Sequence, residues 1–316
     1  MDYKVTYATP DRIDLSDYTY RITTLSTTDD LARSIGAIGL LQPPSVIDVA
    51  GRMVVVCGFR RIKALLSLDL GGKEIPLRFL PPATPPMILA AMAISENSFQ
   101  RPLNVVEQSR GIALLKRVCD PPDAWHQIAR SSGLPDSAKA VASILPIVEM
   151  PGALQQAIVD GTIALPVAHQ IDRLEVDDRR AMIDLLRRIR VGLNVQRELV
   201  ERITEICRRD RISIARLLAQ DRVREILEND LTPMPQNVQQ LRDFLKTERF
   251  PALRQAEQGY RQAMKALHLP AQIQIQPPPF FEGKTYQIKL QVETRHQLQA
   301  MQRDLDRLAA SSLLPD

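Results

Sequence analysis

Apolar residues recur with both helical and strand periodicity in the first hundred residues. After two acidic residues at 29–30, three apolar residues at spacings of four and three predict a helix. The apolar runs 45–49 and 53–57 predict two strands joined by a tight turn. Gly58 then ends the second strand and a further helix follows it. Residues 1–103 are therefore predicted to form a small mixed α/β domain.

The pattern is helical throughout from Asn104 to about Arg224. Asn104 and Glu107 have the spacing of an N-terminal capping box. Several short helices follow, separated by proline and glycine residues. Short helices joined by tight turns are typical of a helix-turn-helix bundle, so residues 104–230 are predicted to be an all-α domain.

The last part of the chain changes character twice. A polar helix over about 237–267 and three prolines at 277–279 predict that residues 231–279 are a helical and proline-rich linker. The remaining residues, 280–316, contain an alternating strand pattern and then a coiled-coil-like stripe, formed by Leu298, Met301, Leu305 and Leu308. One strand and one helix are too small to bury a core alone, so two copies are expected to pair as a homodimer. Docking of this unit onto its own chain is the alternative.

Composition limits the class of protein. A chain of 316 residues is long enough for two or three domains, and the multi-domain α+β reading agrees with that length. A net charge of +4 and an isoelectric point near 9.0 permit a polyanionic partner such as double-stranded DNA. No stretch approaches the roughly 20 apolar residues of a membrane span, and the first residues do not form a signal peptide. We therefore expect a cytoplasmic location and no membrane partner.

The cysteines are scattered and odd in number, which argues against a disulfide framework and against a zinc site. They are predicted to be small core residues: Cys57, Cys119 and Cys207.

Polar residues that suit a triphosphate and a metal ion lie in the first domain. Gly58 lets the backbone turn tightly from strand to helix, and the amides of that helix's first turn can receive phosphate oxygens. Arg60 and Arg61 add charge-assisted donors. Glu96 and Asn97 offer adjacent oxygen ligands of the kind that Mg²⁺ takes alongside phosphates. Taken singly, these residues also fit a solvated basic turn and a surface pair.

The order of these segments resembles that of the ParB family of chromosome and plasmid partition proteins. The family carries Gly-Leu-x-Gln-Pro, Gly-Glu-Arg-Arg-x-x-Ala, Glu-Asn-x-x-Arg and Leu-Asn-Pro-x-Glu, matched here by 39–43, 58–64, 96–101 and 103–107. The resemblance implies a ParB/sulfiredoxin-like domain that binds CTP and Mg²⁺. Carried over by position, the nucleotide contacts are Gln42, Gly58, Phe59, Arg60, Arg61, Ala64, Asn97 and Arg101. The metal ligands carried over in the same way are Glu96 and Asn97.

Two positions depart from the family pattern. Phe59 stands where the family has Glu, and Gln100 rather than Arg101 aligns with the family's Arg when no gap is allowed. These departures favour nucleotide binding over efficient hydrolysis. Any CTP hydrolysis is therefore expected to be slow, and no catalytic residue is assigned.

Residues 127–151 have the layout of a helix-turn-helix with Gly133 in the turn. Short residues at the start of the second helix allow close approach to a major groove, and Lys139 can reach a phosphate or a guanine edge. Aligned backwards from Pro151, this helix resembles the ParB pattern Ser-Arg-Ser-x-Val-Ala-Asn-Leu-Leu. The DNA contacts predicted in this way are Ser137, Ala138, Lys139 and Ser143.

The helix-turn-helix also departs from the family. The turn is two residues longer, Ala138 replaces an Arg, Pro146 interrupts the second helix, and Val167 occupies the place of a His. The DNA sequence recognised by the family therefore cannot be transferred to this chain. Later arginines can hold the DNA backbone, which gives affinity without sequence choice, although a solvated surface with ion pairs explains each of them as well. They are Arg179, Arg180, Arg187, Arg188, Arg190, Arg208, Arg209, Arg211 and Arg216.

Three functions remain open from the sequence. The first, implied by the resemblance, is a dimeric, CTP-gated DNA clamp that is associated with the nucleoid and engages a ParA-type ATPase. The second is a diverged ParB-like transcriptional regulator that binds DNA without a nucleotide switch. The third is an enzyme of a related fold, but His126 and His169 lack a neighbouring nucleophile or metal partner.

Overall fold

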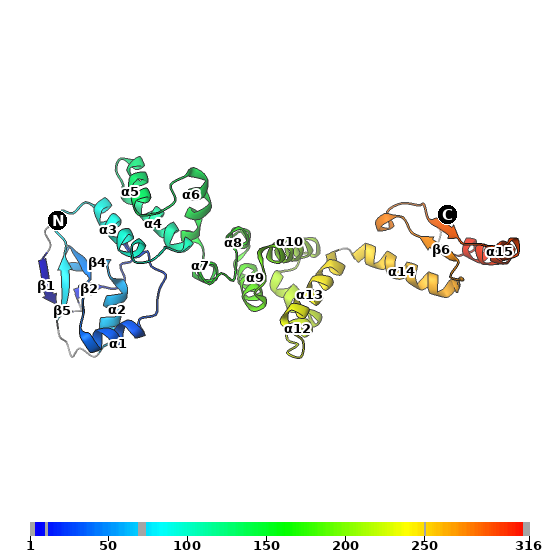
Figure 1. Cartoon of the computed structure of the whole chain (residues 1–316), viewed down its shortest axis with the longest axis horizontal. Coiled ribbons are helices and arrows are strands. Elements are labelled where there is room, and N and C mark those ends of the chain that lie inside the picture. The colour runs from blue at the N-terminus through cyan, green and yellow to red at the C-terminus, as the bar shows by residue number, and fades with distance from the viewer. Residues whose placement is uncertain (1–3, 10–11, 69–73, 250, 312–316) are drawn as a thin grey trace. The chain divides into compact units, whose positions relative to one another are not determined.

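The computed structural model describes residues 4–9, 12–68, 74–249 and 251–311. The chain divides into a first unit, residues 1–174 with 186–190, and a second unit made of the remaining residues. Figure 1 follows the chain from the blue N-terminal sheet to the red C-terminal helix. Within the described residues, no helix combines the length and apolarity that crossing a bilayer requires.

A five-stranded mixed sheet in the order β1-β5-β3-β4-β2 begins the first unit. Its strands are β1 (Lys4–Ala8), β2 (Ile13–Asp14), β3 (Ser45–Val49), β4 (Arg52–Cys57) and β5 (Ile75–Phe79). The two predicted strands are confirmed as the antiparallel pair β3 and β4. Ala50 and Gly51 have φ angles of 52° and 83° in their turn, which is typical of a two-residue hairpin. Asp48 Oδ1 accepts a hydrogen bond of 2.8 Å from the amide of Gly51.

Both faces of the sheet are covered. The helices that follow its strands are α1 (Asp29–Ile38), α2 (Phe59–Ser67) and α3 (Pro86–Ser98). Successive side chains of β4 point to opposite faces, so Met53 and Val55 enter the core beneath α1 and α2. Val54 and Val56 enter the core that includes α3. Burial on both faces explains why this strand is a continuous apolar run.

Helices complete the first unit. They are α4 (Val105–Val118), α5 (Trp125–Ser131), α6 (Ala138–Ile144), α7 (Gly152–Val159) and α8 (Leu165–Asp172), with 3₁₀ turns η2 (Pro122–Ala124) and η3 (Leu145–Glu149). The predicted capping box of α4 is confirmed, with both reciprocal hydrogen bonds between Asn104 and Glu107 present. Pro146 lies in η3, so it does interrupt the helix after α6.

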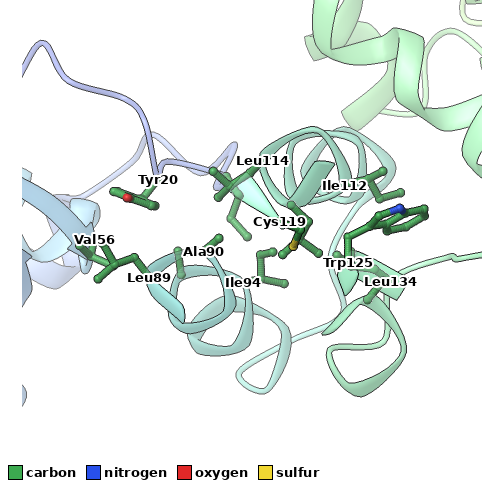
Figure 2. Packing of buried hydrophobic residues seen from close by; sticks show 14 of the residues in the cluster. Tyr20, Val56, Leu89, Ala90, Ile94, Ile112, Leu114, Cys119, Trp125 and Leu134 are labelled. Carbon is green, nitrogen blue, oxygen red and sulfur yellow. The ribbon is translucent and has the colours of Figure 1, made fainter. Parts of the chain in front are cut away.

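One hydrophobic cluster joins the sheet to these helices. Figure 2 shows it running from Val56 and Leu89 at one end to Trp125 and Leu134 at the other. Cys119 packs within it, and all three cysteines are free and buried, as predicted. The cluster crosses residue 103, so α3 and α4 share one core.

The later helices are α9 (Val176–Ile189), α10 (Leu193–Asp210), α11 (Ile214–Leu218), α12 (Asp221–Leu227) and α13 (Met234–Arg249). Val238, Leu241 and Leu245 of α13 are buried. The guanidinium of Arg242 donates to both carboxylate oxygens of Glu198 on α10, at 3.0 and 2.7 Å. The first half of the predicted linker is therefore a packed helix.

The C-terminal part contains α14 (Pro251–Leu267), β6 (Ile273–Gln276), η4 (Pro279–Phe281), β7 (Gln287–Leu290) and α15 (Arg295–Ala309). Two helices, α13 and α14, replace the single polar helix that was expected. Strand β6 was missed, and it pairs antiparallel with β7. The three prolines at 277–279 thus lie between the paired strands β6 and β7.

A small core forms within one chain at this end. Ile273 and Ile275 of β6 pack with Met301 and Leu308 of α15, and α14 adds Tyr260 and neighbouring residues. Helix α14 and strand β6 supply apolar surface that the size argument from the sequence did not include. For Met301 and Leu308, docking onto the same chain is therefore what the structure shows.

Candidate nucleotide and DNA sites

The turn from β4 into α2 places two arginines beside the sheet. Gly58 has φ 88° and ψ 30°, a left-handed conformation that favours glycine. A Cβ atom built on Gly58 would lie 2.8 Å from Nη2 of Arg61. Glycine is therefore needed here both for the turn and for the position of the Arg61 guanidinium.

Arg61 connects three segments that are distant in the sequence. Its Nη1 donates to the carbonyl oxygen of Gln42 at 2.8 Å, and its Nη2 forms an ion pair with Glu96 of α3. The side chains of Arg61 and Glu96 are only 16% and 23% exposed, so this pair is poorly screened by water. Arg60 donates to the carbonyl of Thr27 at 3.0 Å, while its Nε is buried and has no acceptor among the described residues.

These side chains surround one cavity of about 250 Å³, which we call the nucleotide cavity. Seven of the residues predicted to contact nucleotide or metal line it: Gln42, Gly58, Phe59, Arg60, Arg61, Glu96 and Asn97. Ala64 is fully buried in the core beneath α2. The structure thus gathers residues from positions 42 to 97 around one space.

Arg101 lies elsewhere. Its guanidinium makes a bidentate contact with Glu107, at 2.7 and 2.6 Å, and Glu107 is completely buried. Gln100 lines the nucleotide cavity, in keeping with the ungapped alignment. Glu107 also accepts a hydrogen bond of 2.8 Å from the amide of Thr24, so Arg101 belongs to a buried structural network.

The donor set for a metal ion is small. Asn97 donates its amide nitrogen to the carbonyl of Ala93 at 2.8 Å, which orients the side chain. Among the described residues no group of three or more His, Cys, Asp or Glu could hold a metal ion. One carboxylate and one amide oxygen match what Mg²⁺ takes from a protein when phosphates and water complete its shell. Glu96 and Asn97 therefore fit Mg²⁺ only together with a phosphate-bearing ligand.

Cys57 lies in the wall of the same cavity but does not suit nucleophilic chemistry. Burial, and then the carboxylate of Glu96, raise the pKa of its thiol. The thiol stays protonated at neutral pH, and a protonated thiol is a poor nucleophile. The enzyme hypothesis gains no candidate nucleophile here.

Helix α6 presents the predicted DNA contacts to solvent. Ser137 caps the helix by accepting a hydrogen bond of 3.4 Å from the amide of Ala140. Val141 faces the core, whereas Ser137, Ala138, Lys139 and Ser143 are exposed. Lys139 and Ser143 are four residues apart and share the face that points away from Val141. His169 of α8 contacts the carbonyl oxygen of Ser143 at 2.8 Å, so this histidine has a structural contact that the sequence did not indicate.

Some arginines proposed for the DNA backbone have protein partners. Arg187 pairs with Asp160 at 3.3 Å. Arg209 binds Asp210 and donates to the carbonyls of residues 248 and 249 at 2.8 and 2.7 Å. The carboxylate of Asp178, on the same helix as Arg180, accepts a hydrogen bond from the backbone amide of Ile214. Arg180, Arg188, Arg190, Arg208, Arg211 and Arg216 are exposed.

Comparison with known proteins gives distant sequence relatives, while no family model matches the chain. Nucleoid occlusion proteins of Listeria monocytogenes serotype 4b and Listeria innocua serovar 6a are 26% identical over 156 residues. The match covers 49% of this chain and 52% of each relative. The chain therefore spans about half the length of the curated relatives that it matches.

Solved ParB structures are also similar. The C-terminally truncated ParB of Caulobacter crescentus complexed with CTP-gamma-S is 24% identical, covering 58% of this chain and 98% of that one, with a TM-score of 0.27. The same protein complexed to the centromeric parS site is 19% identical, covering 62% and 98%, with a TM-score of 0.32. A Pnob8-like ParB-N domain is 14% identical, covering 77% and 98%, with a TM-score of 0.33. Together with the ordered motifs, the sequence relatives confirm the resemblance of this chain to the ParB family of partition and nucleoid occlusion proteins.

Proposed function

We propose that this chain is a ParB-like DNA-binding protein whose nucleotide cavity binds CTP with Mg²⁺. In the proposal, nucleotide closes two copies of the chain around DNA during chromosome or plasmid partition, and a ParA-type ATPase is the partner. The observation that carries it is the gathering of seven predicted residues around one cavity. The choice of CTP rests on the family, since a similar ParB was solved with CTP-gamma-S.

The polar groups of the cavity support a triphosphate with its metal. Arg61 and Glu96 neutralise each other in the structure described. With nucleotide bound, Arg61 would pair with phosphate oxygens instead of Glu96, and Glu96 would bind Mg²⁺ instead of Arg61. Each of the two side chains would therefore keep a partner of opposite charge. Arg60 Nε, which is buried without an acceptor, would gain one. The cavity is slightly smaller than the roughly 300–1,000 Å³ usual for ligand pockets, so part of the nucleotide would extend beyond it.

Replacing Lys139 with alanine is expected to weaken DNA binding. Lys139 is exposed at the start of α6, where a positive side chain can reach the DNA backbone. Loss of one phosphate contact should lower affinity by about tenfold and reduce the slope of log affinity against log salt by about 1. Fluorescence anisotropy with duplex DNA over a range of salt concentrations measures both. Unchanged affinity and slope, compared with the surface variant Arg33→Ala, would remove α6 from the interface.

Homodimerisation through residues 280–316 remains a prediction. Leu298 lies on the same helical stripe as the buried Met301 and Leu308, yet it is 46% exposed. It is the part of the stripe that a second copy can cover. Leu298→Glu should weaken the dimer at least about tenfold, because burial of a leucine contributes roughly 1.5–3 kcal/mol. Analytical ultracentrifugation tests this, and an unchanged dimer constant would place the interface elsewhere.

The diverged regulator is the second candidate. Phe59 occupies the family's Glu position, and Gln100 lines the cavity where the family has Arg, so a nucleotide switch that used those two family groups would lack both of them here. Chromatin immunoprecipitation separates the two functions. A clamp that loads at a site and slides should cover DNA well beyond it, and Arg61→Ala should confine that signal to the site. Immunoprecipitation signals confined to the binding site for both the wild type and Arg61→Ala would support the regulator and contradict the clamp.

A further inference from the structure

A second and larger cavity lies in the first unit, with a volume of about 610 Å³. Its walls are the segment 18–24, helix α4, the end of η3 and helix α7. We call it the arginine cavity. Ile22 and Thr23 line both this cavity and the nucleotide cavity, so one stretch of chain separates them. Its volume falls within the range of typical small-molecule sites.

Positive charge dominates its lining. Arg21, Arg110 and Arg117 face it, against one acidic residue, Glu149. Arg110 and Arg117 are two helical turns apart on α4, which places them on the same face. Ala113 lies between them and also lines the cavity. Like charges held together in this way attract an anion.

The three arginines are held by neutral partners. Arg110 donates to the carbonyl of Thr23 at 3.1 Å and to Gln155 Oε1 at 2.7 Å, and Arg117 donates to the carbonyl of Thr19 at 3.1 Å. Among the described residues, none of the three forms an ion pair with a carboxylate. Burial, and then repulsion from Arg21, lower the pKa of Arg110. The protein therefore pairs none of these three guanidinium groups directly with a carboxylate, although Glu107, which is bound by Arg101, favours the charged form of Arg110.

Arg21 is the least satisfied of the three. Its Nε is buried and has no acceptor among the described residues, and its guanidinium lies 5.0 Å from the centroid of the Tyr18 ring. A buried donor without an acceptor is costly, and stacking on an aromatic ring does not supply one. The planar fork of a guanidinium matches the oxygen atoms of a phosphate group.

The space beside Gly152 is open. Gly152 lines it at the start of α7, and a Cβ atom added there would meet nothing within 4 Å. Open space, three guanidinium groups without an ion pair among the described residues and the unsatisfied donor of Arg21 therefore occur together. We propose that the arginine cavity is a second anion site, which binds a phosphate-bearing small molecule and is separate from the proposed nucleotide site.

The test is calorimetric titration of the full chain with inorganic pyrophosphate and, separately, with the phosphomonoester glucose 6-phosphate. We expect binding of at least one of them to survive in Arg61→Ala, which disables the nucleotide cavity. Arg21→Gln and Arg117→Gln should each weaken it about tenfold or more, as expected for loss of a charge-assisted hydrogen bond. Arg33→Gln, which removes an exposed positive charge on α1, should change nothing. Arg110 is left intact because its hydrogen bonds hold the segment 18–24 to α4 and α7.

Three results would overturn the proposal. One is no binding of either compound at millimolar concentration by folded protein, with folding checked by circular dichroism. Another is binding that is lost in Arg61→Ala, because the nucleotide cavity would then be the anion site. The third is binding that Arg21→Gln and Arg117→Gln leave unchanged. If those two variants instead lower the affinity for duplex DNA, the arginines serve a DNA surface.

Discussion

Glu107→Ala is expected to lower the free energy of unfolding of the first unit by about 4 kcal/mol, since removing one partner of a buried ion pair typically costs 3–5 kcal/mol. The carboxylate is completely buried and accepts hydrogen bonds from Arg101, from the amide of Thr24 and from the amide of Asn104. Without the Glu107 carboxylate, these three donors lose the acceptor that they share. The hydrogen bond that joins the segment 18–24 to α4 through this carboxylate is then lost. Urea denaturation at pH 7, followed by circular dichroism, measures the loss.

The same residue predicts a dependence on pH. Burial alone would raise the pKa of Glu107, but the hydrogen bonds from Arg101, Thr24 and Asn104 outweigh it and hold the pKa below the ordinary 4.5. The folded protein therefore binds this proton less readily than the unfolded chain, and the contribution to stability is fully present above about pH 5. It decreases as pH falls through the lowered pKa. The difference between wild type and Glu107→Gln should shrink in the same range, and a difference that is constant down to pH 3 would contradict this reading.

Gly58→Ala is expected to abolish nucleotide binding at a cost in stability of only about 1–2 kcal/mol, the usual cost of a left-handed non-glycine residue. The added Cβ would lie 2.8 Å from the Arg61 guanidinium and so displace it from Glu96 and Gln42. Because Arg61 is the proposed phosphate contact, its displacement removes the site. Calorimetric titration with CTP and Mg²⁺ measures the effect.

Gly51→Ala is the matched control. Gly51 also has a positive φ, 83°, but a Cβ atom there would meet nothing within 4 Å. This variant should lose similar stability from backbone strain while binding nucleotide like the wild type. Nucleotide binding by Gly58→Ala at wild-type affinity would show that Arg61 does not depend on this glycine.

Local patterns in the sequence predicted part of the first unit, whereas strands β1, β2 and β5 were not predicted. The strands of the β3–β4 hairpin and the helix after Gly58 follow from periodicity and turn residues, and the capping box of α4 follows from Asn104 and Glu107, which are three residues apart. Strand β6 was missed although Ile-Gln-Ile-Gln alternates, because four residues beside a proline run give a weak signal. Helix α13 was assigned to a linker because its apolar stripe is thin, yet that stripe is buried.

The candidate sites needed more than local patterns. Family resemblance named the residues of the nucleotide cavity, but only tertiary contacts bring Arg61 to Gln42 and Glu96, which are 19 and 35 positions away. Sequence alone did not reveal that Arg101 binds Glu107, since both residues lie within motifs that had another interpretation. The arginine cavity gave no sequence signal, because Arg21 and Arg110 are brought together only by the packing of the segment 18–24 on α4.

Calorimetric titration with CTP, ATP, GTP and UTP in Mg²⁺ tests the central claim most directly. The proteins to compare are the wild type, Arg61→Ala and the surface control Arg33→Ala. We predict that CTP alone binds to the wild type and to Arg33→Ala, and that Arg61→Ala binds no nucleotide. Absence of binding by the wild type, or CTP binding that survives in Arg61→Ala, would contradict a nucleotide site in this cavity.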